Sequence, residues 1–240
     1  MDIFNLNIID VVFVLFILCG GVVGMKRGVF KELVMTIGYL LLIIISLILK
    51  TPIAEFLSLH LPFFNFAGDF SGLVVLNILL YQLVAFILVF ALLSIIFNII
   101  VAVTKVFEKI LDATIVLGIL SKILGLIVGL IEGYLIVFLL SVALSYPIFN
   151  QTVVAESKLK DKILNSTPVL SSAAKTMTET VDEVINLSKT DVKNDKDEFN
   201  RQTVDIMLEH KLVTPKYIEK LIDAGKIDVP GMDKVVKKYK

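Results

Sequence analysis

The sequence predicts an all-α membrane protein with about four transmembrane helices that pack through rows of glycine, followed by a helical soluble tail. Hydrophobic residues make up 57% of the 240 residues, and the mean hydropathy is +0.88, whereas apolar residues make up about 45–50% of soluble domains. Long uncharged runs precede Pro147, and charged residues recur from Glu156 onward. We therefore expect a four-helix transmembrane domain at residues 1–148 and a helical, partly flexible soluble tail at residues 149–240.

Four apolar runs have roughly the length of about 20 residues that a helix needs to cross the hydrocarbon core. Charged or turn residues bound the runs; Lys26 and Arg27 follow the first, and Lys50, Thr51 and Pro52 follow the second and are expected to end its helix. The expected spans are residues 8–24, 29–49, 77–101 and 123–144.

Two longer connections differ in character. Residues 55–70 combine aromatic side chains with prolines, which favours an interfacial loop or a short surface helix. Residues 106–120 mix charged and apolar side chains in an amphipathic pattern, which predicts a short helix on the membrane surface. On the third span, Asn77, Gln82 and Asn98 are expected to make interhelical hydrogen bonds.

The basic residues of the short loops predict the orientation in the membrane. Those of the first and third loops are Lys26, Arg27, Lys31, Lys105, Lys109 and Lys122. The second loop has only Lys50. This distribution places the first and third loops in the cytoplasm and, with four spans, both ends of the chain outside. A miscount of one span would move the tail to the cytoplasm, so the side that the tail occupies stays open.

The tail begins with a predicted helix. Thr167-Pro168 is typical of an N-cap followed by proline at the first helical position, and the helix is expected to end near Ser188. The segment 187–199 is almost entirely polar, which predicts a linker.

A helical hairpin is predicted at the end of the tail, over residues 199–210 and 215–224. Thr214 is expected to cap the second helix, and Gly225 is expected to close it. A hairpin of this size is marginally stable alone in water, so we expect it to pack against another part of the chain.

Two rows of glycine at a spacing of four residues mark the first and fourth spans. The rows are Gly20, Gly24 and Gly28, and Gly125, Gly129 and Gly133. In lipid, small residues at this spacing let two helix backbones approach closely. In the predicted orientation both rows occupy the cytoplasmic half of the bilayer and could face each other, within one chain or between two chains. Glycine is also common in membrane helices without such a role.

Glu132 is an acidic residue inside the fourth span, about ten residues or about 15 Å of helix beyond Lys122. Carboxylates at such a depth usually face a bundle interior or a watery cavity and mark a proton or substrate path. The alternative is structural, with Glu132 paired with Lys26, Arg27 or Lys31, or protonated and hydrogen-bonded. Both interpretations stay open.

The sequence shows no set of residues typical of catalysis or of cofactor or metal binding. Cys19 is the only cysteine and lies among large apolar residues, so we expect a buried side chain without chemistry. His60 and His210 have no second ligand at metal-binding spacing. We therefore expect no catalytic residue, no cofactor, no metal, no nucleic-acid partner and no enzymatic activity.

The segment Arg27-Gly28-Val29-Phe30-Lys31-Glu32 follows an apolar helix with Asp10 near its start, and it resembles the Arg-Gly-x-x-x-Glu signature of the colicin V production protein family. The glycine row at 125–133 resembles the second motif of that family, and the similarity covers about residues 5–145. Two positions depart from the family pattern. Glu132 stands where a basic residue is usual, and Ser121-Lys122 stands where an Asp or Asn followed by Arg is usual.

The resemblance implies a multi-pass protein of the bacterial plasma (inner) membrane that assists toxin or bacteriocin production or export and envelope homeostasis, without catalytic residues. Expected partners are the lipid bilayer and either secretion or envelope proteins or a second copy of the chain. The alternatives are a small transporter or channel subunit that uses Glu132 in the membrane, and a membrane scaffold that recruits a partner through its tail. The candidate functional residues are Arg27, Glu32 and Glu132.

Overall fold

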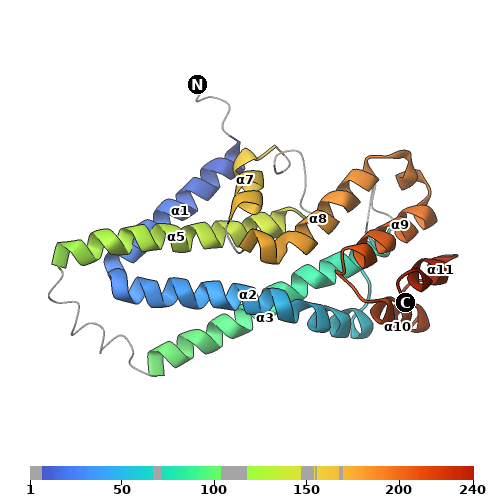
Figure 1. The fold of residues 1–240 in the computed structure, drawn as a ribbon, viewed down its shortest axis with the longest axis horizontal. Helices are drawn as coiled ribbons and strands as arrows, with labels where there is room; N and C mark the ends of the chain where they lie inside the picture. The colour runs from blue at the N-terminus through green and yellow to red at the C-terminus, as the bar shows by residue number, and fades with distance from the viewer. Residues whose placement is uncertain (1–6, 67–71, 104–117, 147–153, 155, 168–169) are drawn as a thin grey trace. The chain divides into compact units, whose positions relative to one another are not determined.

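The computed structural model describes residues 7–66, 72–103, 118–146, 154, 156–167 and 170–240, and these residues form helices without any β-strand (Figure 1). The helices are α1 (Ile8–Arg27), α2 (Val29–His60), α3 (Leu76–Val103), α5 (Gly118–Leu144), α7 (Lys158–Ser166), α8 (Leu170–Ser188), η3 (Asp191–Asn194), α9 (Lys196–Glu209), α10 (Pro215–Asp223) and α11 (Met232–Lys237).

Helices α1, α2, α3 and α5 are each long and apolar enough to cross a membrane. They carry large apolar side chains on their outer surfaces; Leu15, Ile48, Ile95 and Ile119 are each more than half exposed. Soluble proteins rarely expose contiguous apolar surface on this scale, whereas lipid tails cover it without cost. The chain is therefore a multi-pass membrane protein, and the predicted all-α membrane fold with a helical C-terminal region is confirmed.

The chain divides into two compact units. Unit 1 comprises Met1–Ser46, Val89–Leu144 and Phe149–Ser171, and unit 2 comprises Leu47–Leu88, Ser145–Ile148 and Ser172–Lys240. Helices α2 and α3 therefore contribute residues to both units. The predicted division separates residues 1–148 from residues 149–240, whereas each compact unit combines separate stretches of the chain. The division at residue 148 stays a prediction.

Helix α2 does not end at Pro52, where the sequence predicted that it would. It continues to His60 and contains 32 residues, or about 48 Å at 1.5 Å per residue, whereas the hydrocarbon core is about 30 Å thick. An internal proline removes one backbone hydrogen bond. Ala54 and Ser58, beyond the proline, are fully buried, so packing in unit 2 outweighs that loss. The position along α2 at which the span ends stays a prediction.

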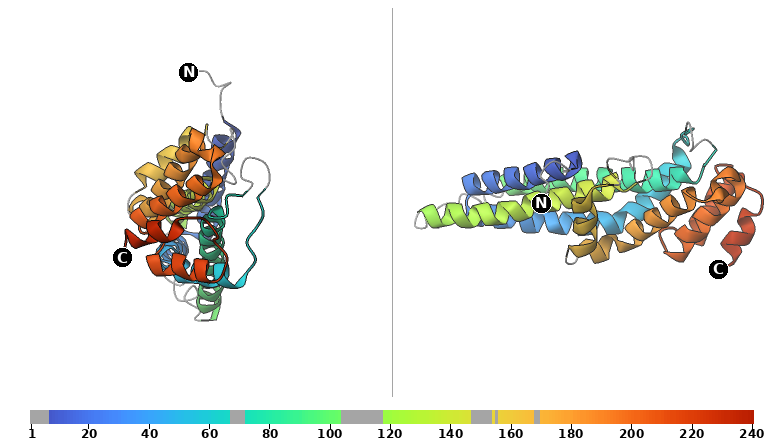
Figure 2. Two further views of the ribbon diagram at one scale, coloured as in Figure 1. Left: turned by 90° about the vertical axis from the view of Figure 1, so that its right-hand side faces the viewer. Right: turned by 90° about the horizontal axis from the view of Figure 1, so that it is seen from above.

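In unit 1, α1 and α5 lie side by side (Figures 1 and 2), and α7 contacts both. Asp10, near the start of α1, orders the beginning of α7. Its Oδ1 accepts hydrogen bonds from the Ser157 hydroxyl and from the Leu159 backbone N–H, the latter at 3.3 Å. The Ser157 hydroxyl in turn accepts from the Lys160 N–H at 3.1 Å and caps α7. The sequence did not predict α7.

In unit 2, the tail helices pack on the second half of α2 and the first half of α3. The Ser58 and Tyr217 hydroxyls lie 2.7 Å apart, and the Asn200 side chain binds the Val75 N–H at 3.3 Å. Lys220 forms an ion pair with Glu55. Burial raises the pKa of Tyr217, so its hydroxyl stays neutral and can donate. The predicted hairpin therefore packs against the ends of two long apolar helices.

The polar residues of α3 behave differently from one another. Gln82 accepts a hydrogen bond from Lys50 of α2 at 3.1 Å, and Asn98 donates to a tyrosine hydroxyl of α2 at 3.4 Å, so both are interhelical as predicted. Asn77 instead binds the backbone of Phe64, in the connection between α2 and α3, as acceptor at 2.7 Å and donor at 3.1 Å.

The predicted linker over 187–199 is helical in part. It contains η3, and α9 begins at Lys196. Asp195 is the N-cap of α9, because its side chain accepts a hydrogen bond from the Glu198 N–H at 3.0 Å. Thr167 is the C-cap of α7, and its carbonyl accepts from the Ser171 N–H at 2.9 Å, as the carbonyl of an N-cap does. Pro168 lies outside the described residues, as do residues 106–117 of the predicted surface helix, so the predicted Thr167-Pro168 helix start stays a prediction.

Thr214 caps α10 through its hydroxyl, which accepts from the Tyr217 N–H at 3.2 Å. Replacing Thr214 with alanine should lower the free energy of unfolding of the tail by about 1 kcal/mol, because the Tyr217 N–H loses its acceptor. Thermal unfolding in detergent followed by circular dichroism measures the change. Thr214→Ser keeps the acceptor and is the control; equal stability of the alanine and serine variants would contradict the cap.

Candidate functional site

The two glycine rows bring the backbones of α1 and α5 into direct contact. A Cβ atom on Gly24 would lie 2.7 Å from the Gly129 Cα, and one on Gly20 would lie 2.8 Å from the Gly133 Cα. Such distances essentially never occur for real Cβ atoms, and the obstructing atoms are backbone, which cannot swing away. The contact is within one chain, and it needs the absence of side chains at both rows.

Gly28 is the single residue that separates α1 from α2. Its φ of 78° lies in the left-handed region, and its N–H donates to the Gly24 carbonyl at 2.9 Å. A Cβ atom here would lie 3.0 Å from the Ser121 Oγ. That oxygen accepts a hydrogen bond from the Val29 N–H at 3.3 Å. Ser121 on α5 therefore binds the first residue of α2.

The turn places Arg27 between two carboxylates. Its Nη1 lies 3.4 Å from the Glu32 Oε2 and 3.4 and 3.3 Å from the Glu132 Oε1 and Oε2. The Glu32 side chain is fully buried, that of Glu132 is 10% exposed, and that of Arg27 is 31% exposed. The structure thus brings together all three candidate functional residues, which we call the Arg27 cluster.

The direction of helical side chains explains how Arg27 and Glu132 meet although their backbones lie at different heights along the helix pair. Helical side chains lean toward the N-terminus of their own helix. Arg27 is the last residue of α1, and the antiparallel α5 runs past it, so the Arg27 and Glu132 side chains lean toward each other from opposite ends. Glu32 lies in the first turn of α2, which Gly28 turns back beside them. Of the three bases considered for Glu132, Arg27 is a partner.

The charges of the Arg27 cluster do not cancel when both glutamates are ionised. One guanidinium faces two carboxylates, and two carboxylates that share a site favour retention of a proton on one of them. The Glu32 Oε1 is buried without a hydrogen-bond partner among the described residues, and so is the hydroxyl of Thr36, one turn further along α2. The cluster therefore has the composition of a site that can hold a proton or a small cation beside an ion pair.

Ser121 and Thr36 are residues that sequence reasoning missed as parts of this site. From the sequence, Ser121 is only a departure from the family pattern, and Thr36 has no predicted role. A small polar residue on a lipid-inserted helix, spaced four residues from an acid, was the available signal for Thr36. Nothing in the sequence signalled Ser121, because its partner is a backbone N–H.

The cysteine and the histidines of the described residues form no metal site. No group of three or more His, Cys, Asp or Glu side chains there could hold a metal ion. The prediction of a buried Cys19 is wrong, because the residue is exposed on the apolar surface of α1. His210 does have acidic neighbours from α8; its Nε2 lies 2.8 Å from the Glu183 Oε1.

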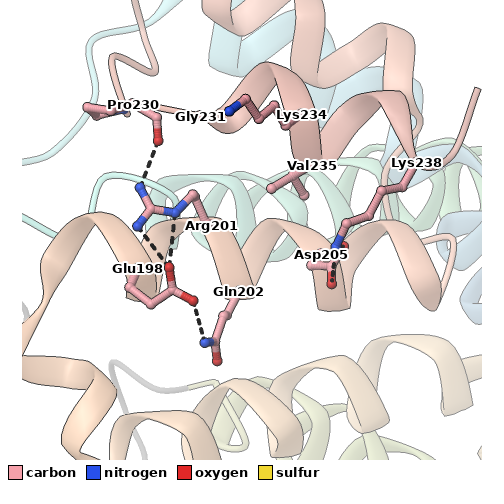
Figure 3. A pocket seen from close by; sticks show the side chains of 9 residues that line it. All are labelled: Glu198, Arg201, Gln202, Asp205, Pro230, Gly231, Lys234, Val235 and Lys238. Atoms are coloured by element: carbon pink, nitrogen blue, oxygen red, sulfur yellow. Dashed lines mark hydrogen bonds and ion pairs between the residues drawn. The ribbon is translucent and has the colours of Figure 1, made fainter.

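A groove of about 410 Å³ lies between α9 and α11 (Figure 3). Four of its charged side chains, Glu198, Arg201, Asp205 and Lys238, are already bound to neighbours. Arg201 donates to the Glu198 carboxylate at 2.8 Å and to the Pro230 carbonyl at 2.7 Å, and Lys238 lies 3.3 Å from Asp205. Hydrogen bonds from Gln202 and Arg201 lower the pKa of Glu198. These contacts hold α11 on α9, which is a structural role.

Gly129→Ala should disrupt the packing of α1 on α5, because its Cβ would lie 2.9 Å from the Gly24 Cα. We expect a clear loss of thermal stability in lipid nanodiscs and weaker cross-linking between cysteines placed on α1 and α5. Val22→Ala, on the exposed surface of α1, is the control and should change neither. Unchanged stability of Gly129→Ala would contradict the close contact.

Arg27→Gln should destabilise the protein by about 3–5 kcal/mol, because it leaves buried carboxylates without their cation. The double variants Arg27→Gln/Glu32→Gln and Arg27→Gln/Glu132→Gln should each recover part of the loss. Unfolding in mixed detergent micelles compares six proteins: the wild type, the single variants Arg27→Gln, Glu32→Gln and Glu132→Gln, and the two double variants. Additive losses in the double variants would show that the three side chains do not interact.

The comparisons with known proteins give a match to a family model. No curated protein and no solved structure matches the chain. The family model described as Colicin V production protein matches residues 9–168, which is more than half of the chain and includes α1, α2, α3, α5 and the Arg27 cluster. The chain therefore belongs to the Colicin V production protein family.

Proposed function

We propose that this protein assists toxin or bacteriocin production or export, and envelope homeostasis, as a non-enzymatic protein of the bacterial plasma membrane. The observation that carries the proposal is the family match over residues 9–168. The matched region contains the glycine contact and the Arg27 cluster. Arg27 and Glu32 lie in the segment that resembles the family signature, whereas Glu132 departs from the family pattern. We infer that the Arg27 cluster keeps α1, α2 and α5 in the arrangement that partner proteins recognise.

A deletion strain tests this proposal directly. Loss of the protein should reduce export of a peptide toxin or raise envelope permeability to a dye, and the wild-type chain should restore both. Arg27→Gln should restore neither, whereas Val22→Ala should restore both as a matched control on the lipid-facing surface. A deletion strain that matches its parent in toxin export and permeability would overturn the proposal.

The second candidate is a small transporter or channel subunit for protons or small cations. One observation favours it. The Glu32 Oε1 and the Thr36 hydroxyl are buried, without hydrogen-bond partners in the described part of the chain, next to a carboxylate pair that shares one guanidinium. Buried polar atoms of this kind usually bind water or an ion, and acids inside membrane proteins commonly lie on such paths.

Liposomes that contain the purified protein and a pH-sensitive dye separate the two candidates. Transport predicts proton or cation flux that Glu132→Gln and Glu32→Gln abolish while both variants stay folded. Glu55→Gln removes an acid of α2 outside the Arg27 cluster and should leave the flux unchanged. No flux across several gradients, or full flux in Glu132→Gln, would remove the transport candidate and leave the first proposal intact.

A further inference from the structure

A second polar site lies in unit 2, outside the Arg27 cluster. It is a cavity of about 190 Å³ between α2, α8 and the turn that follows α9. The residues that line it are Leu47, Lys50, Thr51, Thr176, Met177, Lys211 and Leu212. Two side chains can carry positive charge and two have hydroxyl groups, whereas no acidic side chain is among these lining residues. The lining is therefore suited to an anion.

Lys50 is the first reason to expect a ligand there. The residue is 6% exposed, and its Nζ donates to the Gln82 Oε1 at 3.1 Å. Gln82 is held in turn, because its Nε2 donates to the Leu212 carbonyl at 3.5 Å. An ammonium group has three donors, and Gln82 supplies its one acceptor among the described residues. A buried cation without a counter-charge is costly, and an anion in the adjoining cavity would remove that cost.

Lys211 is the second and independent reason. Its φ of 57° makes it the one non-glycine residue of the described chain with a left-handed backbone. The helix ends α9 and α10 have the same hydrogen-bond pattern: Leu212 N–H to Met207 carbonyl at 2.9 Å, and Lys226 N–H to Leu221 carbonyl at 2.8 Å. After α10 the left-handed position is Gly225, with φ 65°, as this motif favours. After α9 it is Lys211, an exposed residue that lines the cavity, so a strained backbone is retained at a residue that can bring a positive charge to the site.

We propose that this cavity binds a phosphate-type oxyanion, with Lys50 and Lys211 as its cations and Thr51 and Thr176 as hydroxyl donors. The volume exceeds the roughly 30 Å³ of one water and is below the roughly 300–1,000 Å³ of sites for drug-sized ligands. It therefore suits a single phosphoryl group rather than a nucleotide. The group can come from inorganic phosphate or from the head group of an anionic phospholipid.

The test uses the full-length protein and follows its thermal unfolding by circular dichroism. Inorganic phosphate in detergent tests the free anion, with chloride at equal ionic strength as reference. Nanodiscs of phosphatidylcholine with or without phosphatidic acid test the head group. We expect saturable stabilisation by phosphate or by phosphatidic acid that chloride or phosphatidylcholine does not produce, and the arm that responds identifies the source.

Lys211→Gly is the decisive variant, because the two effects of the change have opposite signs. Without an anion it should raise the melting temperature, since glycine adopts the left-handed backbone without strain. It should also weaken the anion response by at least about tenfold, as expected for loss of a charge-assisted hydrogen bond. Lys50→Met should abolish the response, and Lys216→Ala, an exposed lysine of α10 outside the cavity, should leave it unchanged.

Two results would overturn the proposal. One is the absence of any specific stabilisation by phosphate and by phosphatidic acid in the wild-type protein. The other is a wild-type response that Lys211→Gly retains in full, since the anion would then bind elsewhere. Lys211→Gly decides the question even where Lys50→Met fails to fold, because it replaces a strained residue with the one that the backbone favours.

Discussion

The close approach of α1 and α5 is the constraint on which unit 1 depends. Lipid tails are as apolar as the helix surfaces, so burial of apolar area does not drive helices together, and contact distance decides whether they pack. The glycine rows let the two backbones touch. The same register fixes how far one helix can slide along the other, and it thereby sets the level at which Arg27 meets Glu132. Larger residues in either row would separate the ion pair as well as the helices.

Polar residues of α2 and α3 in unit 2 are stabilised by hydrogen bonds with other residues of that unit. Lys50, Ser58 and Gln82 would be costly in hydrocarbon. In unit 2 they bind one another or the tail: Ser58 meets Tyr217, and Gln82 links Lys50 to the Leu212 carbonyl. A hairpin too small to be stable alone thus gains a packing surface, and polar groups on two long apolar helices gain hydrogen bonds.

The helices themselves could be predicted from local patterns, whereas the errors arose where tertiary packing or the surrounding lipid decides the outcome. Thr214-Pro215 and Gly225 mark the ends of α10 correctly, because caps act within one turn. Pro52 does not end α2, because the cost of a lost backbone hydrogen bond is smaller than the gain from burying Ala54 and Ser58. Cys19 was expected to be buried because its neighbours are apolar, but in a membrane apolar neighbours can equally face lipid.

The sequence by itself determined the membrane class, the presence of four apolar helices, both glycine rows and Glu132, because hydropathy, spacing and an acid inside an apolar run are local properties. Arg27 and Glu32 followed from the resemblance of residues 27–32 to the family signature. Only the tertiary structure decided that Arg27 is shared by Glu32 and Glu132, that Ser121 holds the start of α2, and that Lys50 and Lys211 line one cavity. These pairings join residues far apart in the chain, and their energies depend on distances and burial that arise only when the helices pack.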